Sequence, residues 1–179
     1  MQNNLLGETQ YQAKRYLDAS ISFASAIASD ATNPIFHRNY AAALFMQGMY
    51  GEAAKGYIKA AELDPNNSTY LSNAGWCFYQ GKDYPSACSH LERACALASD
   101  VASYRSDLGA IYLALGDFAR ARACCETAYK LANNPMYMTN LEYVNQREEA
   151  ALYARFGEQI LASVLNDSDY RENDRSNSK

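Results

Sequence analysis

The sequence predicts an all-α protein built from repeated helical hairpins, and three observations lead to that fold class. The 179-residue chain contains 30 Ala but only 9 Gly and 4 Pro, so most of it favours helix. When the chain is shifted against itself by 34 residues, small and apolar residues fall into matching columns. Turn-forming residues recur between those columns. Together these features indicate helix–turn–helix units that stack along the chain.

The first helix of each unit is marked by a large residue followed by a small one, as in Leu108-Gly109. Such a pair anchors the helix in the core and lets a neighbouring helix approach closely. A turn follows at Gly48, Gly81 and Gly116 in three of the units. An aromatic column lies just before the second helix, where it is expected to fill the gap between the two helices of the pair: Tyr16, Tyr50, Tyr84 and Phe118.

The second helix of each unit carries two columns that consist entirely of alanine. Seven positions separate the two columns, which hold Ala19, Ala53, Ala87 and Ala121, then Ala26, Ala60, Ala94 and Ala128. Residues seven apart lie on one face of a helix, and a larger side chain would overpack a close crossing. We therefore expect each second helix to pack through its alanine face.

These columns resemble the pattern of the tetratricopeptide repeat family, over about three-quarters of the chain. Residues 34–67 carry the pattern almost whole, with Tyr40-Ala41, Leu44, Gly48, Tyr50, Ala53, Tyr57, Ala60 and Pro65. The resemblance implies a right-handed α-α superhelix, or solenoid, of about four hairpins. The units it implies are residues 1–33, 34–67, 68–101 and 102–135.

The 34-residue register ends after Pro135, and one further helix is expected at residues 136–165. Apolar residues keep a helical spacing there, at Leu141, Val144, Leu152, Phe156, Ile160 and Val164. We expect this helix to cap the open apolar face of the last hairpin. Residues 166–179 are polar and have nothing to bury, so the sequence predicts a disordered tail.

In the family, the first helices line a concave groove, and the resemblance implies a peptide-binding groove here. The positions it indicates are Tyr11, Arg38, Asn39, Phe45, Met46, Asn73, Trp76, Tyr79, Gln80, Asp107 and Leu113. Asn39 and Asn73 share one column, and an amide there both donates to and accepts from the main chain of an extended peptide. The alternative is that the asparagines bridge neighbouring helices and the aromatic residues pack between hairpins.

One function found in the family is not expected. Members that hold the acidic tail of heat-shock chaperones need lysine and arginine in groove columns. Those columns here offer a single cation, Arg38, beside Asn4, Glu8 and Trp76. An acidic peptide would therefore lack its charge partners.

Charge and composition limit the other partners. The chain has 16 Lys and Arg against 20 Asp and Glu, a net charge of −4, so we expect no nucleic-acid partner. No apolar window reaches the ~18 residues that a membrane span needs, and no secretory signal is apparent at the start. The 5 cysteines are odd in number and lack paired spacing, which favours a reducing compartment. The sequence thus predicts a cytoplasmic protein without membrane insertion.

Catalytic and metal-binding candidates are few. The 2 histidines, His37 and His90, and the 5 cysteines show no metal-ligand spacing, and cysteine is a common small filler in helical cores. We expect no enzyme activity, no cofactor and no metal.

The predicted function is non-catalytic protein binding, as an adaptor, scaffold or chaperone that holds an extended, partly apolar client segment in the groove. A bacterial type III secretion chaperone for hydrophobic translocators is one alternative, since the size and acidic charge agree. A homo-oligomeric assembly subunit that associates through the N-terminal hairpin, at Leu5, Leu6 and Tyr11, is another. A thiol or metal enzyme around Cys88, Cys95 and Cys124 is the least favoured.

Overall fold

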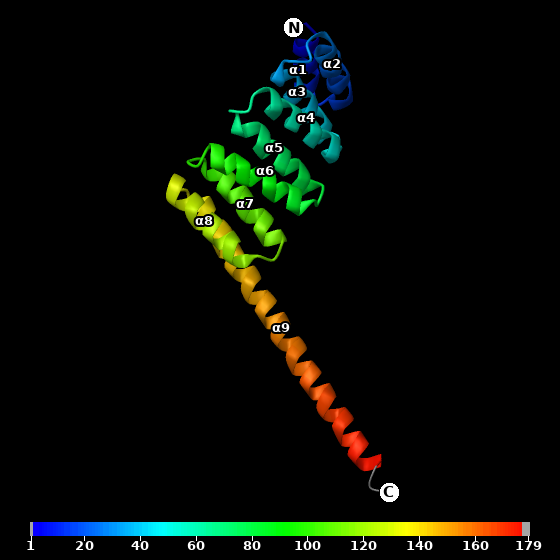
Figure 1. Cartoon of the computed structure of the whole chain (residues 1–179), viewed down its shortest axis with the longest axis vertical. Coiled ribbons are helices and arrows are strands. Elements are labelled where there is room, and N and C mark those ends of the chain that lie inside the picture. Colours follow the sequence, from blue (N-terminus) through cyan, green and yellow to red (C-terminus); the bar gives the residue numbers. More distant parts are fainter. Residues whose placement is uncertain (1, 177–179) are drawn as a thin grey trace.

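The computed structural model describes residues 2–176, with side chains up to residue 159. Over that range the protein is all-helical and contains no strand, which confirms the predicted fold class (Figure 1). The helices are α1 (Gln2–Gln12), α2 (Tyr16–Ser29), α3 (Pro34–Met46), α4 (Tyr50–Leu63), α5 (Ser68–Gln80), α6 (Tyr84–Leu97), α7 (Ala102–Ala114), α8 (Phe118–Ala132) and α9 (Pro135–Ser176).

The first eight helices pack as four successive pairs, each of which lies within one of the predicted 34-residue units. Each pair also packs against the next, so the hairpins form an elongated stack (Figure 1). The first helices of neighbouring units touch as well, in α1 with α3, α5 with α7, and α7 with α9. One face of the stack is therefore formed by α1, α3, α5, α7 and the start of α9.

Asparagine caps fix the starts of α3 and α9 in the same way. Asn33 Oδ1 accepts a hydrogen bond from the Ile35 backbone N–H at 3.0 Å, and Asn134 Oδ1 accepts one from Met136 N–H at 3.0 Å. In both places a proline follows the asparagine at the first helical position, where its missing N–H costs nothing. The start of α9 thus repeats the start of α3.

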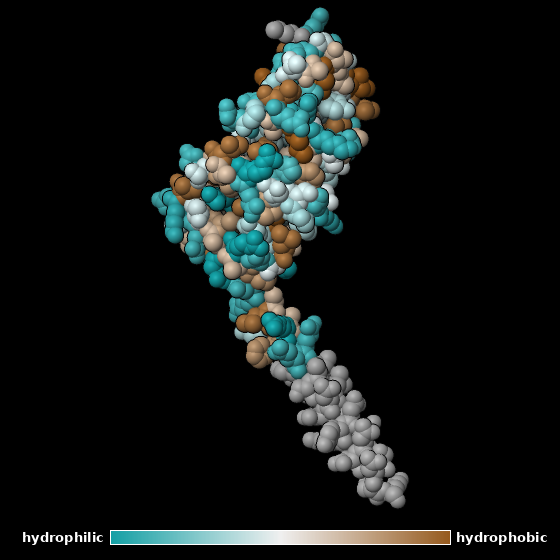
Figure 2. All heavy atoms as spheres, in the orientation of Figure 1, coloured by the Kyte–Doolittle hydropathy of each residue, from teal (hydrophilic) through white to brown (hydrophobic). Residues whose placement is uncertain are grey.

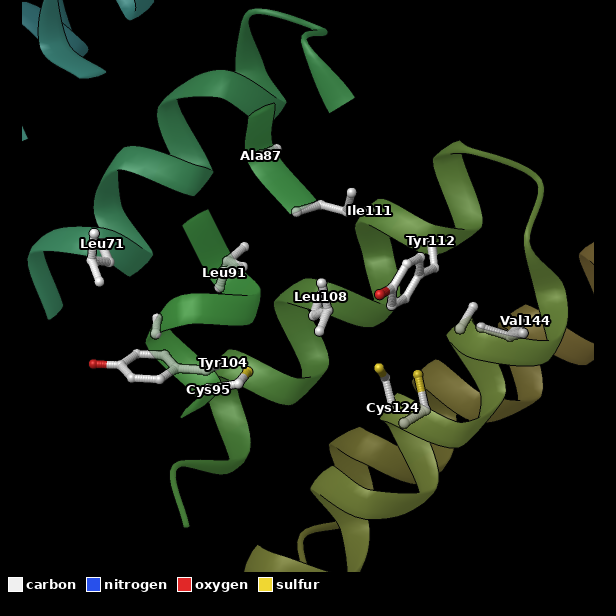
Figure 3. Packing of buried hydrophobic residues seen from close by; sticks show 13 residues of the cluster. Leu71, Ala87, Leu91, Cys95, Tyr104, Leu108, Ile111, Tyr112, Cys124 and Val144 are labelled. Atoms are coloured by element: carbon white, nitrogen blue, oxygen red, sulfur yellow. The ribbon is translucent and has the colours of Figure 1, made fainter. Parts of the chain in front are cut away.

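The core follows the repeat. All eight column alanines are fully buried, as the sequence predicts. Figure 3 shows the largest apolar cluster, centred on Leu108, Ile111 and Tyr112 of α7. Leu91 of α6, Cys124 of α8 and Val144 of α9 complete it, so α9 closes the end of this core.

Helix α9 differs from the expected cap. Its 42 residues extend through Ser176, so residues 166–176 continue a helix where a disordered tail is expected, and residues 177–179 lie outside the described range. No glycine or proline interrupts the chain after Gly157, and adding residues to an existing helix is favourable.

Only the start of α9 acts as a cap. Leu141 packs against the core and Val144 is buried in it, whereas Leu152 and Phe156 are 56% and 59% exposed. Beyond the body the helix projects as a long rod (Figure 1). The side chains of Ile160 and Val164 lie outside the described range. Over residues 2–176, no helix is long and apolar enough to cross a membrane.

Candidate functional site

Two cavities open along the face formed by the first helices. The N-terminal cavity has a volume of about 600 Å³ and lies among α1, α3 and α5. The central cavity has a volume of about 400 Å³ and lies among α5, α7 and α9. Helix α5 contributes to both, with Asn73 in the first and Trp76 and Tyr79 in the second. We call the surface formed by the two cavities the groove.

Eight of the predicted groove residues line these cavities. The N-terminal cavity contains Tyr11, Arg38, Asn39 and Asn73, and the central cavity contains Trp76, Tyr79, Asp107 and Leu113. Phe45, Met46 and Gln80 line neither of them. The Phe45 ring packs against Tyr50, with ring centroids 5.3 Å apart, and so fills the space within its hairpin.

Asn39 is held by its own chain. It is 7% exposed, and its Oδ1 accepts hydrogen bonds from Arg38 Nε at 3.1 Å and from an Arg38 terminal nitrogen at 2.7 Å. Its Nδ2 donates to Asn4 Oδ1 at 2.9 Å and to Glu8 Oε1 at 3.2 Å. Asn39 therefore bridges α1 and α3, which is the alternative left open at this column.

A second bridge of the same kind lies at the other end of the groove. Asn140 Nδ2 of α9 donates to Ser106 Oγ of α7 at 3.0 Å. In the middle of the groove, the side chains of Asn73 and Asp107 have no hydrogen-bond partner among the described residues. Within this column, the side chains at the two ends form hydrogen bonds to a neighbouring helix, and the two in the middle do not.

Sequence reasoning missed the contribution of α9 to the groove. Asn140, Tyr143, Val144 and Arg147 line the central cavity, although the 34-residue register ends before them. The signal lies in the Asn-Pro pairs at 33–34 and 134–135, which are 101 residues apart, one short of three repeats. With that one-residue shift, Asn140 falls in the column of Asn39, Asn73 and Asp107.

Aromatic side chains form one wall of the central cavity. The rings of Trp76 and Tyr79 stack with centroids 5.0 Å apart and planes at 21°. Tyr79 also contacts Tyr84 of α6 at 5.8 Å between centroids, which fixes the pair against the hairpin. The wall is therefore a pre-ordered apolar surface of the kind that anchors binding partners.

The groove carries charge of both signs. Glu8 accepts from Asn4 Nδ2 at 2.8 Å and from Asn39, and Arg38 is engaged by Asn39. Burial raises the pKa of Asp107 to about 6, because removing water disfavours its charged form. Burial likewise raises the pKa of Tyr11.

Cys125 lines the central cavity, whereas the other four cysteines line neither cavity of the groove. Burial raises the pKa of Cys77 to about 12 and that of Cys124 to about 11, and it raises the pKa of Cys88 and Cys95 as well. A thiol that stays protonated is a poor nucleophile. Over the described residues, no three His, Cys, Asp or Glu side chains gather where they could hold a metal ion.

Stacked hairpins with a polar and aromatic groove define a helical-repeat protein-interaction module. Models of the tetratricopeptide repeat match residues 4–68, 50–102 and 102–135. The chain therefore belongs to the tetratricopeptide repeat family, whose members are generally non-catalytic interaction modules. The predicted resemblance is thereby confirmed.

Solved structures share the fold. MamA from Desulfovibrio magneticus RS-1 superposes with a TM-score of 0.74 at 19% identity, covering 87% of this chain and 90% of that one. The first repeat domain of Spaghetti (RPAP3), solved with an HSP90 peptide, gives 0.60 at 26% identity, covering 65% and 94%. A chain of the APC/C hetero-tetramer Cut9–Hcn1 gives 0.68 at 17% identity, covering 79% and 29%. No curated protein sequence matches significantly.

Proposed function

We propose that this protein is a non-catalytic binding module that holds an extended, partly apolar segment of a client protein in the groove. The observation that carries the proposal is the side of α5 that faces the groove, where the side chains are half-buried. Asn73 there presents an amide without a hydrogen-bond partner among the described residues, about one helical turn before Trp76, whose ring stacks on that of Tyr79. Main-chain recognition and an apolar anchor thus lie side by side.

The two asparagines that form hydrogen bonds within the chain, Asn39 and Asn140, have a structural role in this proposal. Asn39 and Asn140 join consecutive first helices and so hold the groove walls at a fixed spacing. A bound segment would have to displace those internal bonds to reach either amide. Asn73 is therefore the position at which the client main chain is read.

The charges of the groove argue against an acidic client. Glu8 and Asp107 are both present, and the one nearby cation in the N-terminal cavity, Arg38, already donates to Asn39. The HSP90 peptide is a ligand of the RPAP3 domain, whereas among the described residues of this chain no lysine lines either cavity of the groove. The proposed client segment is neutral to basic and partly apolar.

The proposal is tested by comparing variants in a pull-down from the native cell, with the retained client quantified by mass spectrometry. Asn73→Ala and Trp76→Ala remove the amide and the anchor, and each is expected to reduce client retention at least tenfold. Leu97→Ala truncates a 51% exposed residue on the second helix α6 and should leave retention unchanged. Full retention by both groove variants would refute groove binding.

Self-association through the N-terminal hairpin is a second candidate that one observation favours. Leu5 and Leu6 of α1 and Leu17 and Ile21 of α2 are between 50% and 65% exposed. Figure 2 shows hydrophobic residues at this end of the molecule. Tyr11, in contrast, lies in the groove, with its ring edge-on to Tyr16 at 5.3 Å.

Multi-angle light scattering separates the two candidates. A self-associating subunit gives a mass above that of the 19.9 kDa chain, and the double variant Leu17→Ser, Ile21→Ser returns it to the monomer. A monomeric mass for the unmodified protein across the accessible concentration range would rule this candidate out.

A further inference from the structure

The central cavity holds a carboxylate that nothing in the described chain neutralises. Asp107 of α7 is half-buried and lines the cavity. Among residues 2–159 it accepts no hydrogen bond and joins no ion pair, and burial is the cause of its raised pKa. A buried charge without a partner is costly to the free protein, so a ligand that supplies the partner binds favourably.

The walls around Asp107 suit a cation with an apolar stem. Trp76 and Tyr79 present a stacked aromatic pair, and Leu113 adds an aliphatic surface. The face of an aromatic ring attracts a cation, and the hydrocarbon part of a lysine or arginine packs on apolar surface. The cavity, at about 400 Å³, is open to solvent through the groove and accepts a side chain from an extended segment.

One cationic residue, Arg147 of α9, also lines the cavity. The exposure of Arg147 determines whether a positive or a negative ligand is preferred there. Arg147 is exposed, so water already solvates its charge, and it forms no ion pair with Asp107. Asp107 is the more deeply placed group and gains more from a counter-charge. The preferred occupant is therefore positive.

We propose that the central cavity is a specificity pocket for a lysine or arginine side chain of the client, which pairs with Asp107 and lies against Trp76 and Tyr79. The inference rests on the proposed function, because it places that residue within the segment held in the groove. It adds a sequence requirement: a basic residue among apolar ones.

The single tryptophan of the chain, Trp76, makes the pocket directly observable. Two acetylated and amidated heptapeptides of alternating leucine and alanine are compared, with a central lysine in one and a central norleucine in the other. Each is titrated into the full-length protein at neutral pH while Trp76 emission is recorded. The lysine peptide is expected to bind roughly tenfold more tightly, as a charge-assisted contact in a half-buried site provides.

Three variants of the full chain sharpen the test. Asp107→Asn keeps the shape and removes the charge, so it should reduce lysine-peptide binding to the norleucine level. Asp100→Asn makes the same change at an exposed position before α7 and should have no effect. Arg147→Gln removes a like charge and should leave lysine-peptide binding equal or tighter.

The outcomes separate this inference from the proposed function. Equal affinity of the two peptides for the unmodified protein, with Trp76 responding to both, would overturn the cation pocket while leaving groove binding intact. Weaker lysine-peptide binding by Arg147→Gln would mean that Arg147 helps to hold the peptide and does not oppose its lysine, which would also overturn the cation pocket. If Trp76 responds to neither peptide, the pocket and the groove both fail. The peptide comparison needs no variant and holds even if Asp107→Asn folds poorly.

Discussion

At the scale of single residues, one turn position recurs through the whole repeat. Lys14, Gly48, Lys82 and Gly116 are spaced by 34 residues, and all have positive φ, at 59°, 77°, 62° and 75°. Glycine adopts this left-handed conformation freely, whereas a residue with a Cβ is strained there. The repeat thus uses a glycine position that two of its units fill with lysine.

Lys82→Gly is expected to raise the free energy of unfolding by about 0.5–1 kcal/mol, because relief of strain exceeds the added entropy of the unfolded chain. Gly48→Lys, the reverse change in the neighbouring unit, should lower it by about 1 kcal/mol. Urea denaturation followed by circular dichroism measures both. If Lys82→Gly lowered the free energy of unfolding and Gly48→Lys raised it, backbone strain at this turn position would not be what limits stability.

The burial of Asp107 makes the free energy of unfolding depend on pH. Burial raises its pKa from 3.8 to about 6, so the folded state binds the proton more tightly than the unfolded state. The stabilisation from the neutral form is complete below pH 3.8 and is lost as the pH rises through about 6. Ionised Asp107 therefore destabilises the fold at neutral pH.

Asp107→Asn should increase the free energy of unfolding by about 1–2 kcal/mol at neutral pH, after allowance for solvent screening. The gain should shrink on acidification and vanish well below pH 3.8, where the aspartate is neutral in both states. Asp100→Asn serves as the control, since that carboxylate is exposed. A gain that does not change with pH would contradict burial as the cause.

At the scale of elements, close helix crossings depend on small residues that the sequence places by column. A Cβ built on Gly75 of α5 would lie 2.9 Å from Leu91 Cγ and 3.1 Å from the Ala87 carbonyl oxygen of α6. The backbone oxygen cannot move without shifting α6. The two helices therefore meet at a distance that only glycine permits.

Gly75→Ala is expected to cost about 1–3 kcal/mol through overpacking. The matched change Gly51→Ala in α4 meets nothing within 4 Å and should stabilise by about 0.5–1 kcal/mol, as alanine is the better helix former. Thermal unfolding of both variants measures the difference. A neutral Gly75→Ala would show that α5 and α6 separate easily.

Helix α9 has two parts that differ in how they pack. Its start takes the place of a first helix in a fifth hairpin, with Arg122 of α8 donating to Asn145 at 3.0 Å and pairing with Glu148. Its later part projects away from the stacked hairpins.

Val144→Ala should lower the free energy of unfolding by about 1–3 kcal/mol, because Val144 is 2% exposed. Phe156→Ala should change it by no more than about 0.5 kcal/mol, because Phe156 is 59% exposed. Equal losses in denaturant would mean that the distal part also packs on the body.

At the scale of the whole molecule, the sequence predicts the structural features that recur in every repeat, but it does not predict those that occur only once. The hairpins and the buried alanine faces follow from columns, because identical packing needs recur every 34 residues. The hydrogen bonds of Asn39 could not be predicted, because they depend on how far α1 stands from α3. The part that α9 plays in the groove was hidden by a one-residue change of register.

The central claim, that the groove receives a client segment, is tested most directly by site-specific photo-crosslinking in the native cell. A photoreactive phenylalanine analogue replaces Tyr79 in the groove or, as the reference, Leu97 on the outside of α6. The account predicts a discrete crosslinked client from position 79 and none from position 97. A client that crosslinks equally from both positions, or only from position 97, would contradict it.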